Sequence, residues 1–320
     1  MNRAFEKVAE VGIVPVISLN DPQDAVSLAG ALCEGGLPVM EITLRTTDAL
    51  RCIRSVRKAY PDMILSAGTV LSSAQVDEAV AAGADYVVSP GYNPQTAEYC
   101  RTHGVEIIPG CVTAYEIDAA MAAGLQILKF FPAEQSGGVE AIKLLSGPFD
   151  KVRFLPTGGI GFDNLSKYLA CGNVIACGGS FMAKSNLIAA RKWDEITQNV
   201  RRSLDLSLDF ELAHVGVNGG DSQEAEKAAA RLGALLRMPL RYGSKSVFAG
   251  TAVECMQKPI AGKNGHIGFW CNSCERAIAW FSRCGVSVLE DTAQPDTHGS
   301  IKFVYLDEEI LGFAIHIIKR

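Results

Sequence analysis

Residues 39–45 read Val-Met-Glu-Ile-Thr-Leu-Arg, and this stretch decides how the first part of the chain is interpreted. Side chains alternate between the two faces of a β-strand, so Glu41, Thr43 and Arg45 would share one face. A strand that serves only packing does not carry a carboxylate, a hydroxyl and a guanidinium on one face. In a closed barrel of parallel strands, this polar face would point inward, toward the C-terminal mouth where active sites lie.

Short apolar runs alternate with amphipathic helical stretches along the chain up to residue 206. The apolar runs cover residues 12–17, 38–44, 63–67, 86–89, 106–109, 126–130, 152–156 and 174–177. The helical stretches begin at capping residues such as Asp21, Ser72 and Thr113, and they end at glycines such as Gly83. Eight β-α units without a spare edge strand predict an α/β fold, a (β/α)8 TIM barrel over residues 1–206.

A different pattern follows a last helix that we expect over residues 193–206. Residues 210–320 contain an internal repeat in which a strand and a helix are followed by two strands. The first copy has strands at 212–217, 246–249 and 251–257 with a helix at 222–237; the second has strands at 265–270, 301–306 and 313–318 with a helix at 273–284. This repeat predicts a second, smaller α+β domain of paired β-α-β-β modules.

Lys129 lies in the run Ile-Leu-Lys-Phe-Phe-Pro-Ala-Glu, residues 127–134. A lysine that follows an apolar strand and is enclosed by phenylalanines and a proline would be poorly hydrated, which favours the neutral, nucleophilic amine. Such an amine forms a Schiff base with a ketone. A snorkelling surface lysine is the alternative for an isolated run. The polar face of residues 39–45 in the same predicted barrel favours the catalytic interpretation.

Two glycine pairs follow the last two predicted strands of the barrel. Pro-Thr-Gly-Gly-Ile occupies residues 156–160, and Cys-Gly-Gly-Ser occupies residues 177–180. A single Gly-Gly more often marks a turn. Barrels commonly bind phosphate in these two loops through backbone N–H groups, so the two pairs together indicate a phosphate site.

Composition and charge exclude several classes of function. The chain has 30 basic and 35 acidic residues, a net charge of −5 and no long block of like charge, so neither nucleic acid nor an anionic membrane is an expected partner. Neither a signal peptide nor a membrane-spanning segment is recognisable. The 10 cysteines lack the spacing of a disulfide framework, which favours a reduced cytoplasm. Small-molecule substrates are the expected partners.

The ordered motifs of the first part resemble those of the 2-keto-3-deoxy-6-phosphogluconate (KDPG) and 4-hydroxy-2-oxoglutarate aldolase family. These motifs are Glu-Ile-Thr-Leu-Arg-Thr at 41–46, Ser-Ala-Gly-Thr-Val at 66–70, Ser-Pro-Gly at 89–91, Lys-Phe-Phe-Pro-Ala-Glu at 129–134, Pro-Thr-Gly-Gly-Ile at 156–160 and Gly-Ser at 179–180. The resemblance implies a pyruvate-releasing aldolase that needs no cofactor and assembles as a trimer.

The resemblance also implies roles for individual residues. Lys129 would form the Schiff base and Glu41 would shuttle protons. The substrate-binding residues would hold the pyruvate carboxylate (Arg45, Thr69), shape the pocket (Pro90, Phe131) and hold the phosphate (Thr157, Gly158, Gly159, Gly179, Ser180). An iminium on the lysine would turn the carbanion left by C3–C4 cleavage of a 2-keto acid into a neutral enamine.

Residues 210–320 resemble the vicinal-oxygen-chelate, or glyoxalase-like, fold. The resemblance implies a divalent metal held by His214, Glu254, His266 and His316, and such residues suit a borderline divalent ion. Isolated strand histidines are more often hydrogen-bonded core residues. Three alternatives therefore stay open for this domain: an accessory to the aldolase, a metabolite-binding regulatory module, or a separate metal-dependent enzyme.

Overall fold

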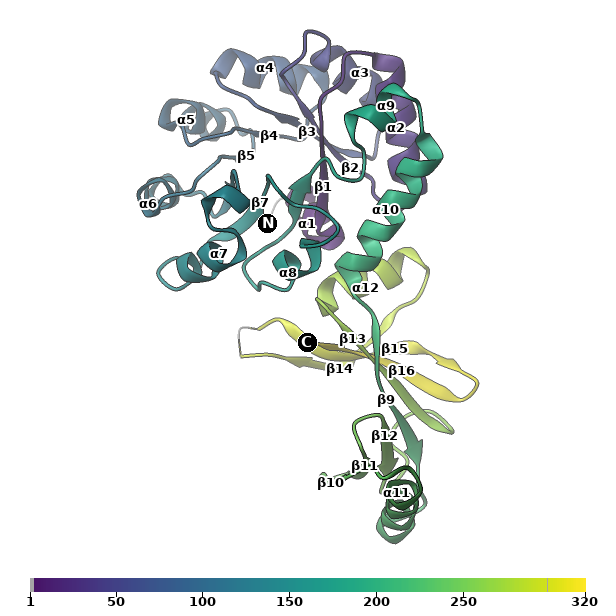
Figure 1. The fold of residues 1–320 in the computed structure, drawn as a ribbon. Coiled ribbons are helices and arrows are strands. Elements are labelled where there is room, and N and C mark those ends of the chain that lie inside the picture. Colours follow the sequence, from purple (N-terminus) through teal and green to yellow (C-terminus); the bar gives the residue numbers. More distant parts are fainter. Residues whose placement is uncertain (1–2, 298) are drawn as a thin grey trace. The chain divides into compact units, whose positions relative to one another are not determined.

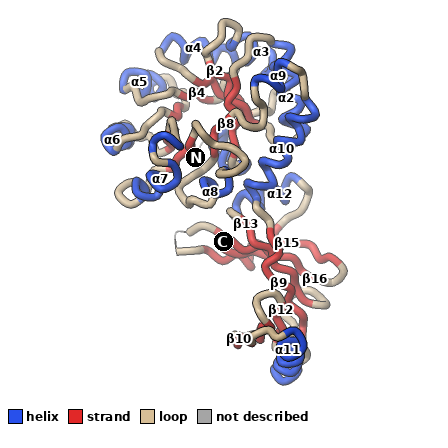
Figure 2. The backbone as a smooth tube through the Cα atoms, in the orientation of Figure 1, coloured by secondary structure: helices blue, strands red, loops and turns tan. Residues whose placement is uncertain are grey.

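The computed structural model describes residues 3–297 and 299–320. The chain divides into two compact units, Met1–Ser207 and Leu208–Arg320, and each is described by itself (Figures 1 and 2). Across the described ranges, no helix is long and apolar enough to cross a membrane.

The strands of the first unit form a ring. They are β1 (Ile13–Ile17), β2 (Val39–Thr43), β3 (Ile64–Gly68), β4 (Tyr86–Val88), β5 (Ile107–Ile108), β6 (Ile127–Phe130), β7 (Arg153–Pro156) and β8 (Cys177–Gly179). One sheet has the order β5-β4-β3-β2-β1-β8, and β6 pairs with β7. Parallel bridges from Gly110 to Lys129 and from Thr157 to Gly178 join the two parts. The unit is therefore a (β/α)8-like barrel.

Helices surround the strands of this barrel (Figure 1). They are α1 (Arg3–Val11), α2 (Pro22–Glu34), α3 (Ala49–Ala59), α4 (Ser73–Ala82), α5 (Pro94–Thr102), α6 (Ala114–Ala122), the 3-10 turn η1 (Glu134–Ser136), α7 (Gly138–Ser146), α8 (Leu165–Leu169), α9 (Ser185–Ala189) and α10 (Trp193–Leu208). The predicted caps are confirmed: Asp21, Ser72 and Thr113 each accept a backbone N–H of the first turn, and Thr113 and Glu116 form a capping box.

The predicted position of the eighth strand, residues 174–177, is wrong. In the structure, residues Cys177, Gly178 and Gly179 pair with β1, whereas Val174 makes only an isolated bridge to Phe154. Glycines are depleted in strands, so the sequence pattern ended the strand too early. A Cβ at Gly178 would lie 2.3 Å from Thr157 Oγ1, so a glycine is needed where β7 and β8 approach each other.

The inward face of β2 is polar although the whole strand is buried. Glu41 and Thr43 are each 1% exposed, while Met40 and Ile42 are fully buried. The apolar pair belongs to the large core that includes Leu28, Leu32 and Ile53 on α2 and α3. The strand therefore packs on one side and delivers functional groups on the other.

The second unit is an eight-stranded sheet with order β10-β11-β12-β9-β13-β16-β15-β14. One module comprises β9 (Glu211–Asn218), α11 (Ser222–Leu236), β10 (Leu240–Tyr242), β11 (Ser246–Ala249) and β12 (Val253–Met256); the other comprises β13 (Gly265–Cys271), α12 (Cys274–Arg283), β14 (Val288–Pro295), β15 (Ile301–Ile310) and β16 (Phe313–Lys319). In each, the last strand runs parallel to the first. The two first strands pair antiparallel at the centre of the sheet.

The predicted β-α-β-β modules are therefore incomplete, because each module has a third strand after its helix. The missed strands, β10 and β14, lie at the two ends of the sheet. Both are largely exposed and mix polar with apolar residues. Neither shows the apolar alternation that marks a half-buried strand, so sequence periodicity could not reveal them.

Helix α10 packs on the barrel at a glycine. A Cβ at Gly35 would lie 2.5 Å from Val200 Cγ1, and Thr197 Oγ1 donates a hydrogen bond to Ala31 O at 3.1 Å. We expect Gly35→Ala to lower the free energy of unfolding by about 1–3 kcal/mol, the usual cost of overpacking. Gly172→Ala is the matched control, since a Cβ there meets nothing within 4 Å. Urea unfolding of both variants measures the difference; equal stabilities would contradict the tight contact.

Candidate functional site

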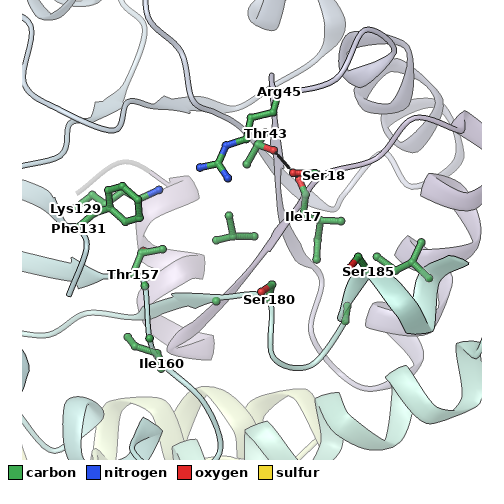
Figure 3. Close-up of a pocket in the computed structure, with 16 residues that line it drawn as sticks. Ile17, Ser18, Thr43, Arg45, Lys129, Phe131, Thr157, Ile160, Ser180 and Ser185 are labelled. Carbon is green, nitrogen blue, oxygen red and sulfur yellow. Dashed lines mark hydrogen bonds between the residues drawn. The ribbon is translucent and has the colours of Figure 1, made fainter. Parts of the chain in front are cut away.

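A cavity of about 320 Å³ opens at the C-terminal ends of the barrel strands. Its wall includes the ends of β1, β2, β6, β7 and β8 and the first turn of α9 (Figure 3). The lining residues are Val16, Ile17, Ser18, Thr43, Arg45, Lys129, Phe131, Thr157, Gly158, Gly159, Ile160, Gly179, Ser180, Ala183, Ser185 and Ile188. Polar groups from five strands or strand ends thus converge on one small space.

Lys129 and Glu41 form a buried pair across the barrel. Lys129 Nζ lies 3.4 Å from Glu41 Oε1, and the two side chains are 7% and 1% exposed. The ammonium also lies 5.3 Å from the centre of the Phe131 ring. Within the described residues, Glu41 Oε2 has no hydrogen-bond partner, so one carboxylate oxygen is available to a molecule bound at the lysine. The pair combines an enclosed amine with a proton acceptor.

Backbone hydrogen bonds position Lys129, and a glycine leaves room for Glu41. The Lys129 N–H donates to Pro109 O at 2.9 Å, and Cys111 N–H donates to Lys129 O at 2.8 Å, which ties β6 to the end of β5. Gly68, at the end of β3, lies against the glutamate: a Cβ there would come within 2.2 Å of Glu41 Oε1. The glycine therefore leaves the space that the carboxylate occupies.

Arg45 is positioned by Thr69. Its Nε donates to Thr69 Oγ1 at 3.2 Å, and Thr69 has a left-handed backbone with φ of 60°. A threonine rarely adopts this conformation, and such backbone outliers concentrate at functional sites. The guanidinium of Arg45 is directed toward the same space as the amine of Lys129 (Figure 3). Arg45 can thus offer a planar fork to a carboxylate held next to the lysine.

The loop after β7 contains two consecutive glycines in the left-handed region. Gly158 and Gly159 both have positive φ values, 99° and 78°. Glu134 packs against this loop: its N–H donates to Gly158 O at 3.1 Å, and a Cβ on Gly159 would lie 2.4 Å from its Cγ. Tyr168 in turn donates a hydrogen bond to the Glu134 carboxylate. The loop is therefore held firmly at the cavity wall.

The structure brings together most of the residues that the sequence nominated. Eight of them line the cavity: Arg45, Lys129, Phe131, Thr157, Gly158, Gly159, Gly179 and Ser180. Glu41 and Thr69 stand directly behind this wall, in contact with Lys129 and Arg45. Pro90 is not part of the wall. Sequence reasoning missed Ser18 and Ser185 as lining residues, because a single serine after a strand or at the start of a helix carries no signal beyond that of a turn or cap.

A cluster of three histidines and a glutamate lies in the second unit. His214 on β9, His266 on β13 and His316 on β16 have ring nitrogens within 4.8 Å of one another. Glu254 Oε2 on β12 lies 3.1 Å from His266 Nε2 and 3.3 Å from His214 Nε2, and the two Nε2 atoms are 3.1 Å apart. Gly216 and Gly268 make room for the rings, since a Cβ at either would come within 2.8 Å of them.

Hydrogen bonds alone cannot explain this triangle of atoms. Each Nε2 carries at most one proton, so three mutual contacts among two nitrogens and one carboxylate oxygen leave at least one contact without a hydrogen. Ligand atoms around a tetrahedral ion with bonds of about 2.0–2.1 Å lie about 3.3 Å apart. The separations in the cluster are close to this value, so the residues present fit a divalent metal.

The protonation states of the cluster also fit a metal. Burial, with the neighbouring His266 and His214 rings, lowers the pKa of His316 to about 3, so its ring is neutral at pH 7. Burial alone would raise the pKa of Glu254, but hydrogen bonds from His214, His266 and Ser246 hold it well below its ordinary value. Metal ions require neutral imidazoles and an ionised carboxylate. Nδ1 of His266 and of His316 has no hydrogen-bond partner in the described part of the chain.

Comparisons with known proteins concern the first unit. The family described as KDPG and KHG aldolase matches residues 5–199. A 2-dehydro-3-deoxy-phosphogluconate aldolase of Treponema pallidum is 45% identical over 202 residues, which cover 63% of this chain and 96% of that protein. The KHG/KDPG aldolase of Escherichia coli is 40% identical over 193 residues, covering 60% of this chain and 91% of its own length.

Solved structures of aldolases with these names are also similar to the first unit. The KDPG aldolase of Legionella pneumophila, captured with pyruvate as a covalent carbinolamine, is 34% identical with a TM-score of 0.61 and covers 62% of this chain and 97% of that chain. The 2-keto-3-deoxy-6-phosphogluconate aldolase of Zymomonas mobilis with 3-phosphoglycerate is 34% identical with a TM-score of 0.59, covering 64% and 96%.

Proposed function

This chain belongs to the KDPG and KHG aldolase family, and we propose that it cleaves a 2-keto-4-hydroxy acid to pyruvate and an aldehyde. The observation that carries the proposal is the enclosed amine of Lys129, 3.4 Å from the Glu41 carboxylate at the mouth of the barrel. Substrates named for the relatives are 2-dehydro-3-deoxy-phosphogluconate and 4-hydroxy-2-oxoglutarate. Both have a ketone at C2 and a hydroxyl at C4, which this chemistry requires.

The reaction begins when the neutral amine of Lys129 attacks the C2 carbonyl to give a carbinolamine. Loss of water gives an iminium. When the C4 hydroxyl loses its proton, the C3–C4 bond breaks and its electron pair moves into the iminium, which leaves an enamine and an aldehyde. Protonation of C3 and hydrolysis then release pyruvate and restore the lysine. The imine is itself the electron sink, so the proposed reaction requires no cofactor.

Glu41 is the group that moves protons in these steps. It is the carboxylate in contact with the lysine, and its second oxygen is unpaired within the described residues. It can take the ammonium proton of Lys129, give a proton to the departing carbinolamine hydroxyl and accept the proton of the C4 hydroxyl, directly or through water. One carboxylate within reach of both the Lys129 nitrogen and the C4 hydroxyl can serve each step in turn.

The remaining residues bind the two ends of the substrate. Arg45, held by Thr69, would pair with the pyruvate carboxylate, and Phe131 would shape the pocket around the reacting carbons. Backbone N–H groups of the loops after β7 and β8 would hold a phosphate or a second carboxylate. The residues proposed for this end are Thr157, Gly158, Gly159, Gly179 and Ser180, and the positive φ values at Gly158 and Gly159 support the assignment.

We expect Glu41→Gln to slow pyruvate release by roughly a hundredfold or more, because an amide cannot accept the protons. The amide has almost the same shape, so the fold and binding of pyruvate should be largely retained. Steady-state assays of pyruvate release from both named substrates measure the loss. Glu98→Gln, on the exposed surface of α5, is the control and should be fully active. Unchanged turnover in Glu41→Gln would remove the carboxylate from the mechanism.

We also propose that the second unit is a glyoxalase-like domain that holds one divalent metal ion through His214, Glu254, His266 and His316. The proposal is supported by the paired modules of the sheet and by the 3.1–3.3 Å separations between His214, His266 and Glu254. Three imidazoles and one carboxylate suit zinc, iron or nickel better than magnesium or calcium. Such an ion could serve a second, metal-dependent reaction.

Purified full-length protein loaded with zinc should retain about one ion per chain after dialysis, measured by elemental analysis. His266→Ala should abolish this binding while pyruvate release by the barrel stays intact, because the two sites lie in separate units. His103→Ala, at the exposed end of α5, should bind as the wild type does. Protein that stays free of metal and of normal stability would contradict the metal site.

We propose further that the chain assembles as a trimer in the cytoplasm. Several large apolar side chains of the barrel unit are exposed, among them Tyr115 at 82% and Leu144 at 78%. Association would remove such surface from water.

A further inference from the structure

Two hydroxyl residues at the cavity wall are not explained by the aldolase roles described above. Ser18 follows β1 and Thr43 ends β2, and both line the cavity that contains Lys129. Their oxygens, Ser18 Oγ and Thr43 Oγ1, lie 2.7 Å apart, a good hydrogen bond. In Figure 3 the pair lies on the opposite side of the cavity from Lys129, next to Arg45.

A second contact assigns the direction of this hydrogen bond. Either oxygen of the pair can be the donor, but Thr43 Oγ1 has one proton and also lies 3.2 Å from Ile17 O, which can only accept. Both contacts are hydrogen bonds only when Thr43 donates to Ile17 O and accepts from Ser18, which uses the Ser18 proton. Ser18 is exposed toward the cavity and presents lone pairs to it without a proton. Toward a bound molecule, Ser18 Oγ can thus accept a hydrogen bond but cannot donate one.

An acceptor at this position favours a bound group that can donate a proton. A phosphate or carboxylate oxygen has no proton to donate, so its lone pairs would be repelled by those of Ser18. A substrate hydroxyl can donate to Ser18. The two substrate classes differ in this respect: 2-dehydro-3-deoxy-phosphogluconate has a C5 hydroxyl between the C4 hydroxyl and the phosphate, whereas C5 of 4-hydroxy-2-oxoglutarate is a carboxylate.

We propose that Ser18, oriented by Thr43, is a specificity residue that accepts a hydrogen bond from the C5 hydroxyl of a sugar-acid substrate. This inference rests on the proposed aldolase function and refines its substrate class. The position is suitable, because the carboxylate of the substrate is assigned to Arg45 and its phosphate to the loops of Gly159 and Ser180, so the intervening carbons must cross the cavity between them. The subsite favours polyhydroxylated substrates over 4-hydroxy-2-oxoglutarate.

The test compares three substrates: 2-keto-3-deoxy-6-phosphogluconate, its unphosphorylated analogue 2-keto-3-deoxygluconate, and 4-hydroxy-2-oxoglutarate. Ser18→Ala should lower kcat/KM for both sugar acids roughly five- to tenfold relative to the third substrate, the scale of one lost hydrogen bond to an uncharged group. Ser180→Asp, at the proposed phosphate loop, should instead lower kcat/KM for the phosphorylated sugar acid alone. Ser185→Ala is the matched control, since it removes a hydroxyl from the same wall and should leave the ratio of the two unphosphorylated substrates within twofold.

Thr43→Val gives a second, independent variant. It keeps the shape of the side chain but frees the Ser18 proton, so the preference for the sugar acids over 4-hydroxy-2-oxoglutarate should fall. Equal losses on all three substrates in Ser18→Ala would overturn the proposal, because they would show a structural role. A loss confined to the phosphorylated substrate would also overturn it, since Ser18 would then contact the phosphate. If the wild-type chain releases pyruvate from none of the three, the aldolase function itself is wrong.

Discussion

The contact between Lys129 and Glu41 is the constraint on which the barrel depends for its chemistry. The two residues are 88 positions apart in the sequence, and their side-chain atoms meet at 3.4 Å because β2 and β6 face each other in one ring. Removing two ionisable groups from water is costly, and the contact between them offsets part of that cost. Gly68 leaves room for the carboxylate, and backbone bonds to Pro109 and Cys111 hold the lysine strand.

The order of the elements could be predicted from the sequence because apolar runs and capping residues report local structure directly. Asp21, Ser72 and Thr113 mark helix starts that the structure confirms. The sequence failed where an element has no apolar pattern of its own. The glycines of β8 are assigned to a loop from the sequence, and the edge strands β10 and β14 receive no strand assignment, although tertiary pairing makes each of them a strand.

In the candidate site, too, some residues could be found from local sequence patterns and others only from the tertiary structure. Lys129, Arg45 and the glycine loops could be nominated because unusual residues stand at strand ends. Ser18 could not, since its role depends on the direction of a hydrogen bond that a contact between Thr43 and Ile17 decides. In the second unit, the neighbouring strands β12, β9, β13 and β16 bring four ligand-type side chains together, and two glycines make room for the rings. That arrangement follows from sheet order, which the sequence does not display.

Reductive trapping tests the central claim, that Lys129 forms a Schiff base, most directly. The protein is incubated with pyruvate and sodium borohydride, digested and mapped by mass spectrometry, with Lys129→Ala and the surface variant Lys143→Arg in parallel. The account predicts irreversible inactivation and a single reduced pyruvate adduct on Lys129, formed equally in Lys143→Arg and absent from Lys129→Ala. An adduct on another lysine, or full activity with no adduct after borohydride treatment, would contradict it.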